Sequence, residues 1–397
     1  MIEDATVINN CPACGYGPLE PLMALDSVPT NSCLLLDSAE AATGYPTGAL
    51  RLVLCPACGF ITNRAFDAAR TTYSTAYEET QGFSPRFRQF AQELASQWIE
   101  RHGLRDRHVL EIGCGKGEFL VHLSELGDVH GTGIDPAFVP QRSMHDPEKL
   151  SFIQDRFDGR YLDLRADAVV CRHTLEHIHD VRGFLADVRR MIGDRPDVPV
   201  LFEVPDTVRV LREAAFWDIY YEHCSYFTPG SLARLFRQEG FALTDLWLAY
   251  DEQYIIAEAL PAAPGVRQEP LSLEDDPQTT AKLAHEFARN HQEDVAKRRA
   301  RLQSWLDAGD RVVIWGAGSK GVAWLVSLGV TEEIPYAVDI NPHKHDKYMA
   351  GTGQRIVAPE FMMEYRPDTV VVMNPVYHDE IAAELHRLGV SATLTDA

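Results

Sequence analysis

Hydrophobic and polar positions change their spacing several times along the chain. In residues 85–101 apolar side chains return every three or four positions and place Phe87, Phe90, Leu94 and Trp98 on one face, which predicts an amphipathic helix. Short apolar runs then alternate with helical stretches; the runs are "HVLEIG", "VHGTGID", "DAVVCR" and "VPVLFEVP". Such alternation predicts βαβ units and a mostly parallel sheet.

The C-terminal part repeats this alternation on a smaller scale. Residues 272–309 are charged and helix-forming, and we expect one long connecting helix that ends at Gly309. Beyond it lie the runs "RVVIWG", "IPYAVDI" and "DTVVVMNP". Residues 311–397 are enough for one small α/β unit.

Composition and charge narrow the class of protein. The chain has 397 residues, 45% hydrophobic and 24% charged, which is typical of a soluble protein with more than one domain. Its formal net charge of −21 opposes binding to nucleic acid or to an anionic membrane surface. The polar start "MIEDATVINN" lacks a signal-peptide pattern, and no apolar run approaches the roughly 20 residues that span a bilayer. We therefore expect a cytoplasmic enzyme.

The pentapeptide "CPACG" occurs twice and predicts a metal site. Its copies place Cys11 and Cys14, and then Cys55 and Cys58, in two turns that each aim two thiolates at one point. Four sulfurs match the tetrahedral preference of a structural Zn²⁺ ion, whereas the alternative is four unrelated buried or redox cysteines. The remaining cysteines lack a paired spacing and are expected to be small packed side chains: Cys33, Cys114, Cys171 and Cys224.

Two glycine loops each stand between a predicted strand and a predicted helix. The later one, in "VVIWGAGSKGVAW", has the G-x-G-x-x-G spacing and is followed by Asp339, a pattern typical of nicotinamide dinucleotide folds. The earlier loop, in "VLEIGCGKGEF", is followed by a strand that ends at Asp135. Glycines let a ligand approach the backbone closely, and an acid at the next strand end can accept both ribose hydroxyls. The alternative is a glycine-rich turn without a ligand.

The earlier loop resembles a known cofactor motif. "LEIGCGKGEFL…GTGID" is similar to motif I and its following acid in class I S-adenosylmethionine-dependent methyltransferases. By this resemblance the loop lies under the methionine and ribose parts of the cofactor, and Asp155 in "FIQDRF", at the end of a predicted third strand, contacts adenine. The cofactor-binding residues are then Glu111, Gly113, Gly115, Gly117, Asp135 and Asp155.

The stretch "FWDIYYEHCSYFTPGSL", residues 216–232, concentrates titratable groups. It contains a Y-x-E-H segment, residues 220–223. Together with the cysteine pairs and the methyltransferase motifs, this segment resembles the sugar C-methyltransferases, which methylate a carbon beside the ketone of a nucleotide-linked 4-keto-deoxysugar. The tail, "GAGSKGVAWL…VDINPHKHDKYMAG", is similar to the third domain of that family, so the resemblance covers essentially the whole chain.

The chemistry of that family explains the titratable residues. A carbon next to a ketone must lose a proton before it attacks a sulfonium methyl, and histidine is a suitable base near neutral pH that an adjacent carboxylate can orient. By resemblance His223 is the base, Glu222 belongs to the same pair, and Tyr220 hydrogen-bonds the enolate or the sugar. Two further residues match active-site positions of the family, with Tyr73 as the alternative to the tyrosine: His177 and Tyr77. For each of these the alternative is a structural side chain.

The tail is expected to hold substrate rather than nicotinamide, because too little chain follows Gly316 for a complete dinucleotide fold and a catalytic domain. A cation at the start of a helix favours a phosphate ligand. Lys320, His343 and Lys344 are therefore candidate substrate-binding residues, each with a solvated surface charge as the alternative.

We therefore expect an α/β protein with a central class I methyltransferase doubly wound sheet, an N-terminal zinc-binding domain and a C-terminal Rossmann-like α/β domain. The predicted parts are a zinc-binding, substrate-contacting domain (1–70), an S-adenosylmethionine-dependent domain (71–265), a helical connector (266–310) and a substrate-binding domain (311–397). The expected partner is a small-molecule substrate, and the oligomeric state stays open. Three other functions remain: methyl transfer to another carbon, oxygen or nitrogen acceptor; a non-catalytic zinc-containing binding protein; and nicotinamide binding.

Overall fold

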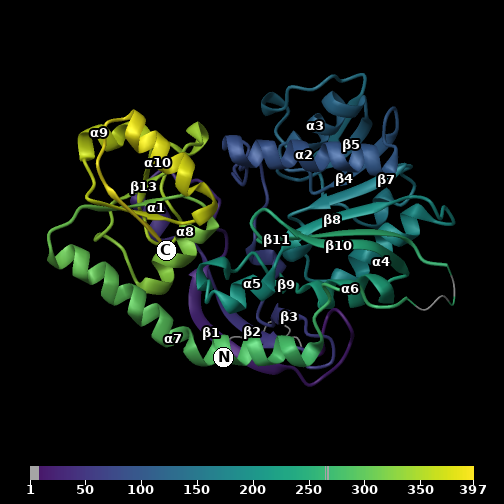
Figure 1. Cartoon of the computed structure of the whole chain (residues 1–397), viewed down its shortest axis with the longest axis horizontal. Coiled ribbons are helices and arrows are strands. Elements are labelled where there is room, and N and C mark those ends of the chain that lie inside the picture. The colour runs from purple at the N-terminus through teal and green to yellow at the C-terminus, as the bar shows by residue number, and fades with distance from the viewer. Residues whose placement is uncertain (1–8, 264, 266–267) are drawn as a thin grey trace.

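Three sheets organise the described part of the chain. The computed structural model describes residues 9–263, 265 and 268–397. Its sheets have four, seven and five strands. The seven-stranded sheet lies on one side in Figure 1, the five-stranded sheet on the other, and the four-stranded sheet below them.

The four-stranded sheet joins two distant parts of the chain. Its order is β1 (Glu20–Pro29), β2 (Thr47–Leu54), β3 (Ile61–Asn63) and β9 (Ser225–Tyr226), and the short helix α1 (Ala39–Thr43) lies in the β1–β2 connection. All its pairs are antiparallel, and β9 pairs Ser225 with Thr62 and Tyr226 with Ile61. This pairing fixes the Y-x-E-H segment, which precedes β9, against the N-terminal part of the chain.

The central sheet has the strand order β10-β11-β8-β7-β4-β5-β6. Strands β4 to β8 are parallel, and the β10–β11 hairpin closes one edge antiparallel. The four runs predicted as strands are β4, β5, β7 and β8. The bounds are β4 (His108–Ile112), β5 (His130–Ile134), β6 (Leu150–Ile153), β7 (Ala168–Arg172), β8 (Val200–Pro205), β10 (Phe241–Ala249) and β11 (Tyr254–Pro261). Because the chain order reverses on either side of β4, a ligand crevice is expected at the carboxyl ends of β4, β5 and β7.

The helices of the central domain cover both faces of this sheet. The predicted helix at 85–101 is α2 (Pro85–His102); Ser84 caps it, and Gly103 ends it with a φ of 61°. Its apolar face buries Trp98, whose Nε1 donates to Glu258 at 2.8 Å. The other helices are α3 (Glu118–Gly127), α4 (Val181–Ile192), α5 (Thr207–Arg212) and α6 (Pro229–Gln238).

The connecting helix α7 (Pro277–Asp307) crosses from the central domain to the C-terminal domain along the lower edge of Figure 1. It begins five residues later than the sequence predicts because Pro277 occupies its first turn and Asp276 caps it by accepting from the backbone N–H groups of Gln278 and Thr279. Asp275 is also engaged outside the helix, where it accepts from Thr228 Oγ1 at 2.9 Å.

The C-terminal domain is a parallel sheet of order β14-β13-β12-β15-β16. Its elements are β12 (Val312–Trp315), α8 (Ser319–Leu328), β13 (Tyr336–Val338), β14 (Arg355–Val357), α9 (Met362–Tyr365), β15 (Thr369–Val372), α10 (His378–Arg387) and β16 (Thr393–Asp396). The three predicted strands of the tail are β12, β13 and β15. The order reverses at β12, so the loop after β12 also lies at a crevice.

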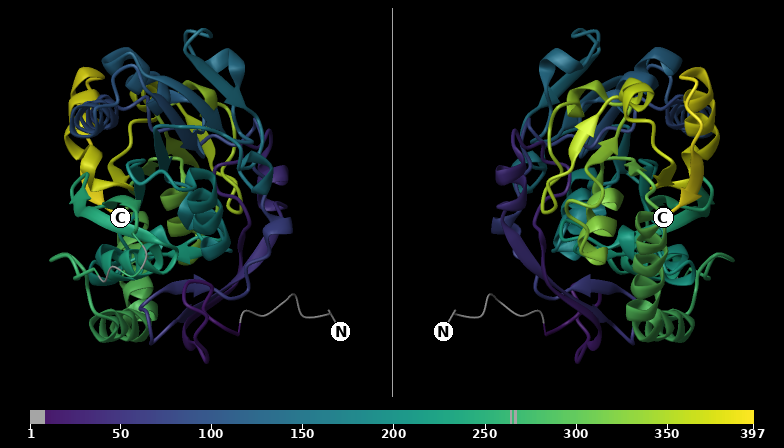
Figure 2. Two further views of the ribbon diagram at one scale, coloured as in Figure 1. Left: turned by 90° about the vertical axis from the view of Figure 1, so that its right-hand side faces the viewer. Right: turned by 90° about the vertical axis from the view of Figure 1, so that its left-hand side faces the viewer.

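Polar contacts hold the C-terminal domain against the central domain. Helix α10 lies beside α2, as Figure 2 shows, and its Glu380 accepts from Ser84 Oγ at 2.9 Å and from the backbone N–H of Arg86 at 2.7 Å. Gln253 and Asn374 exchange two buried amide hydrogen bonds at 2.9 and 3.1 Å. A buried reciprocal amide pair is specific in geometry, so these contacts fix one relative placement of the domains.

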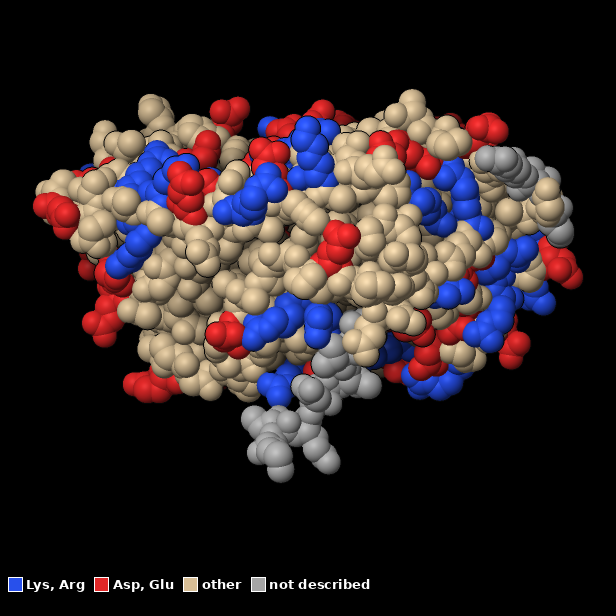
Figure 3. Space-filling model, turned by 90° about the horizontal axis from the view of Figure 1, so that it is seen from below, with Lys and Arg blue, Asp and Glu red and all other residues tan. Residues whose placement is uncertain are grey.

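Surface charge is mixed in sign. On the face seen from below, groups of Lys and Arg alternate with groups of Asp and Glu among the described residues (Figure 3). No helix in the described part of the chain is long and apolar enough to cross a membrane.

Candidate active site

A cavity of about 600 Å³ opens where the three sheets meet. Its walls come from the first glycine loop (residues 113–117), the segment 71–84, the Y-x-E-H segment and the second glycine loop (residues 316–321). The two crevices that the strand orders predict therefore face one shared space.

The first glycine loop needs its glycines. Gly113, Gly115 and Gly117 have φ values of 73°, 53° and 83°, which residues other than glycine rarely adopt. A Cβ on Gly113 would lie 1.8 Å from Thr174 Oγ1. The loop is tied to the next strand because Asp135 accepts from the N–H of Gly115 at 2.9 Å. This hydrogen bond holds the loop backbone at the end of β5, where the loop lines the cavity.

Carboxylates surround this loop. Glu111 is 2% exposed and its Oε2 has no hydrogen-bond partner, and burial raises the pKa of Glu111 to about 8. Burial also raises the pKa of Asp135. Acceptors without donors suit a ligand that carries ammonium, sulfonium and hydroxyl groups, which are the groups of S-adenosylmethionine. The residues at the loop therefore fit this cofactor.

Asp155 reaches the cavity but its carboxylate is already engaged. It accepts from Arg160 Nη1 and from Tyr161 Oη, both at 2.7 Å, and these hydrogen bonds lower the pKa of Asp155 to about 2. To bind adenine, the Asp155 carboxylate would have to accept a hydrogen bond in addition to those from Arg160 and Tyr161. The assignment of Asp155 to adenine stays a prediction.

His223 lies in the cavity wall and is 8% exposed. Its Nε2 lies 2.9 Å from Tyr220 Oη, and its ring centroid is 4.7 Å from that of His177. Burial, together with the electrostatic influence of the nearby His177, His173 and Lys320, lowers the pKa of His223 well below its usual value. The imidazole is therefore neutral near pH 7, as a general base must be.

The Glu222 carboxylate does not orient this imidazole. It accepts from the N–H and Oγ of Ser32, both at 2.5 Å, and from Tyr77 Oη at 2.6 Å. The side chains of Glu222 and His223 therefore have different partners. The hydrogen-bond partner of the His223 ring is Tyr220. Glu222 instead joins the N-terminal domain to the segment before α2.

Both candidate tyrosines of the segment 71–84 reach the site. Tyr77 binds Glu222, whereas Tyr73 Oη lies 2.9 Å from Nδ1 of His177. Their rings contact each other with centroids 5.1 Å apart. The sequence treats the two as alternatives, but the fold gives each a separate partner.

Sequence reasoning missed two serines and one histidine. Ser32 Oγ lies 2.7 Å from Ser319 Oγ, so a hydroxyl pair links Glu222 to the second glycine loop. His173 has a φ of 47° and its Nε2 lies 2.6 Å from Glu203, whose charge raises the pKa of His173 to about 9. No spacing pattern connects these serines, whereas His173 directly follows the predicted strand "DAVVCR", and its place at a strand end is a signal that the sequence offers.

Two of the three candidate substrate-binding residues reach the cavity, one on the second glycine loop and one in the turn after β13. Lys320 and Lys344 line it, with ion pairs from Lys320 to Asp218 at 2.5 Å and from Lys344 to Asp339 at 3.0 Å. His343 is exposed, lies outside the cavity lining and faces Phe83 with ring centroids 5.8 Å apart.

The two cysteine pairs come together. Cys11, Cys14, Cys55 and Cys58 place their sulfurs within 4.8 Å of one another, and no disulfide joins any of them. Such a set fits a tetrahedral Zn²⁺ ion with no position left open for catalysis. The other four cysteines are buried. A second cluster that could hold a metal consists of Glu176, His177 and His223.

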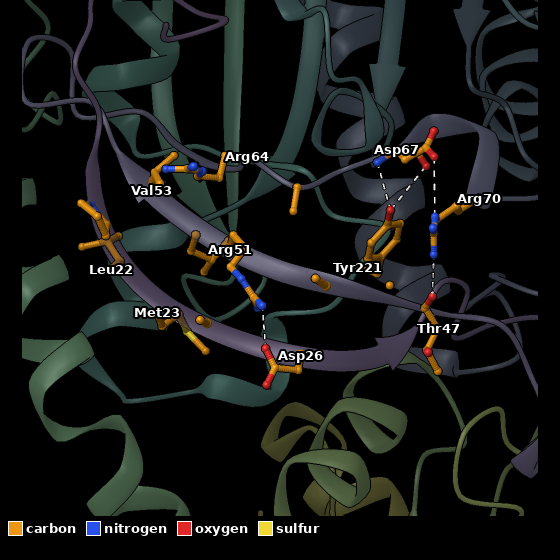
Figure 4. Close-up of a pocket in the computed structure, with 16 residues that line it drawn as sticks. Leu22, Met23, Asp26, Thr47, Arg51, Val53, Arg64, Asp67, Arg70 and Tyr221 are labelled. Carbon is orange, nitrogen blue, oxygen red and sulfur yellow. Dashed lines mark hydrogen bonds and ion pairs between the residues drawn. The ribbon is translucent and has the colours of Figure 1, made fainter. Parts of the chain in front are cut away.

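A separate hollow lies on the β1–β2 ribbon (Figure 4). Arg51 there pairs with Asp26 at 2.5 Å, and Tyr221 Oη accepts from the N–H of Asp67 at 2.9 Å. Tyr221 faces this hollow, whereas Tyr220, its neighbour in the chain, lines the cavity. The hollow is thus separate from the proposed catalytic residues.

Comparison with known proteins gives matches along most of the chain. Residues 86–246 match the model of a methyltransferase domain, and residues 269–392 match that of the C-methyltransferase C-terminal domain. C-methyltransferase NovU from Streptomyces niveus is 28% identical over 94% of this chain and 91% of its own length.

Two solved structures each cover less than half of this chain. One is 1,6-didemethyltoxoflavin-N1-methyltransferase from Burkholderia thailandensis with bound S-adenosylhomocysteine (21% identity, 45% of this chain, 82% of that chain, TM-score 0.35). Another is magnesium protoporphyrin IX methyltransferase from Synechocystis PCC 6803 (16% identity, 44% of this chain, 84% of that chain, TM-score 0.35).

Proposed function

Since the chain belongs to the sugar C-methyltransferase family and is an S-adenosylmethionine-dependent enzyme, we propose that it methylates a carbon next to the ketone of a nucleotide-linked 4-keto-deoxysugar. One observation supports this most strongly. A neutral, buried imidazole and a glycine loop surrounded by carboxylates face the same cavity.

The residues divide the chemistry among them. S-adenosylmethionine, when bound, supplies an electrophilic methyl group on a sulfonium. His223 takes the proton from the carbon beside the ketone, and Tyr220 Oη, 2.9 Å from Nε2, orients the ring and can donate to the enolate oxygen. His177 closes the same wall of the cavity. Positioning of carbanion and methyl group then accounts for the remaining rate enhancement.

The flanking domains have supporting roles in this proposal. Residues 1–70 hold a structural Zn²⁺ ion through Cys11, Cys14, Cys55 and Cys58 and place Ser32 on Glu222. Residues 311–397 hold the substrate, with Lys320 and Lys344 toward its diphosphate. Metal analysis should find one zinc per molecule in the wild-type protein. The Cys58→Ser variant should lose both the metal and cooperative unfolding if the cysteines have this role.

Proton exchange tests the proposed base without methyl transfer. In D₂O the enzyme and a nucleotide-linked 4-ketosugar should give deuterium at the carbon beside the ketone, and His223→Ala should slow this exchange by about 100-fold or more. Because its pKa lies well below 6.5, the wild-type rate should hold its plateau to below pH 6.5 and fall only where the imidazole becomes protonated.

Tyr221→Phe is the matched control, since Tyr221 lies two residues from the base but faces the other hollow. Its exchange rate should stay within about twofold of wild type. Exchange that survives His223→Ala unchanged would exclude His223 as the base.

A further inference from the structure

Two consecutive glutamates in the segment before α2 have opposite surroundings. The carboxylate of Glu78 has partners within the protein, because it pairs with Arg142 and accepts a hydrogen bond from Asn341 Nδ2 at 2.7 Å. The protein leaves Glu79 unsatisfied, because neither of its carboxylate oxygens has a hydrogen-bond partner although both are shielded from solvent. The exposed part of the Glu79 side chain is therefore its aliphatic stem.

The Glu79 carboxylate lies on the first glycine loop. A Cβ on Gly115 would come within 2.8 Å of Glu79 Oε1, so the carboxylate covers the face of that glycine. Glu79 also lines the cavity together with Asp135 and Glu111. It comes from outside the methyltransferase motif, and no spacing in the sequence marks it.

The nearest cation does not satisfy Glu79. Lys116 Nζ is 3.5 Å from Oε2, whereas charge-assisted hydrogen bonds are about 2.7–2.9 Å long. Lys116 instead donates to the carbonyl oxygens of Tyr77 at 2.8 Å and Ala137 at 2.7 Å. Burial raises the pKa of Glu79 to about 7, in agreement with an acid that lacks a donor.

We propose that Glu79 is a cofactor-positioning residue whose carboxylate accepts a hydrogen bond from the non-adenine part of S-adenosylmethionine. A buried carboxylate without a donor costs free energy, and a ligand that brings an N–H or O–H donor removes that cost. Two groups of the cofactor offer such a donor, the ammonium of its amino-acid part and a ribose hydroxyl. The proposal uses the cofactor that the family membership establishes and does not depend on the identity of the sugar.

Calorimetric titration with S-adenosylhomocysteine, in the absence of any sugar, tests the proposal. Glu79→Gln should weaken binding by about 10- to 100-fold, and Glu79→Ala by at least as much. Glu78→Gln removes the same charge one position away and should leave affinity within about twofold. The melting temperatures of the cofactor-free variants should show the reverse order of effects. Glu78→Gln should lower the melting temperature, because Arg142 loses its charged partner, whereas Glu79→Gln should not lower it.

A second titration identifies the donor. 5′-Methylthioadenosine keeps the ribose but lacks the ammonium, so an effect of Glu79→Ala that persists with it assigns the ribose hydroxyl, and one that disappears assigns the ammonium. If both Glu79 variants bind S-adenosylhomocysteine within twofold of wild type, the proposal is wrong. It is equally wrong if they lower the melting temperature as Glu78→Gln does, since Glu79 would then be structural. Either failure leaves the proposed sugar chemistry untouched, because no acceptor is present.

Discussion

The two glycine loops share one backbone plan but differ in the charges around it. In each, an acid at the end of the next strand accepts from a loop N–H: Asp135 from Gly115 at 2.9 Å, and Asp339 from Ala317 at 3.0 Å. Asp339 is then paired with Lys344 Nζ at 3.0 Å. Asp135 has no such partner among the described residues.

This difference separates what the loops can bind. Around the first loop Glu79 and Glu111 have carboxylate oxygens without a hydrogen-bond partner, and Asp135 adds a further acid without an ion pair in the part of the chain that the structure describes, which suits a cationic cofactor. Around the second loop Lys320 and Lys344 bring cations to the cavity wall, which suits an anionic group of a substrate. A glycine spacing therefore predicts a close approach of ligand to backbone, and the charges decide which ligand.

The largest effect should come from the glycines themselves. Gly113→Ala puts a Cβ 1.8 Å from Thr174 Oγ1 at a φ of 73°, whereas Gly318 has ordinary backbone angles and its nearest neighbour would be Lys344 Nζ at 4.0 Å. We expect Gly113→Ala to weaken S-adenosylhomocysteine binding by more than about 100-fold and Gly318→Ala by less than about twofold. Calorimetry measures both. Equal losses would mean that the two loops bind the cofactor jointly.

The second-largest difference is expected between variants of Asp135 and Asp339, the acids that follow the two glycine loops. Asp135→Asn removes the charge that we assign to the ribose hydroxyls and should weaken S-adenosylhomocysteine by about 10- to 100-fold. Asp339→Asn should leave that affinity within about twofold but lower stability by about 3–5 kcal/mol, because Lys344 stays buried without its partner. Urea unfolding and calorimetry on both variants measure the two quantities. The comparison fails if Asp339→Asn is the variant that loses the cofactor.

A smaller effect is expected from the cation of the second loop. In Lys320→Met the partner Asp218 keeps its pair with Arg209 at 2.5 Å, so stability should change little. We expect KM for a nucleotide sugar to rise by about 10-fold while cofactor affinity is unchanged, because one hydrogen bond to an anion is lost. Lys297→Met, on the exposed side of α7, removes the same charge as a control. An unchanged KM in Lys320→Met would place the diphosphate elsewhere.

Local patterns predict much of the fold. The apolar face of α2 and the buried runs of β4, β5, β7 and β8 are visible in the sequence because each is set by near neighbours in the chain. The two-residue pairing of β9 with β3 is not, since a strand of that length carries no periodic signal. That pairing nevertheless places the Y-x-E-H segment.

Candidate site residues follow the same rule. The first glycine loop and the Y-x-E-H segment are short motifs, and the structure brings His223, Tyr220 and His177 to one cavity as the resemblance implies. The partners of Glu222 are 145 and 190 positions away, at Tyr77 and Ser32, and only the tertiary fold joins them. His343 shows the opposite case, because a residue within a promising stretch lies outside the cavity.

The most direct test of the account is the position of the transferred methyl group. The enzyme would be incubated with S-adenosylmethionine carrying a ¹³C-labelled methyl group and a panel of nucleotide-linked 4-ketosugars, and the product examined by carbon NMR and mass spectrometry. We predict that the label is bonded to a ring carbon next to the ketone and that His223→Ala forms no such product. A label on oxygen or nitrogen, or a carbon-methylated product that His223→Ala still forms at the wild-type rate, would contradict the account.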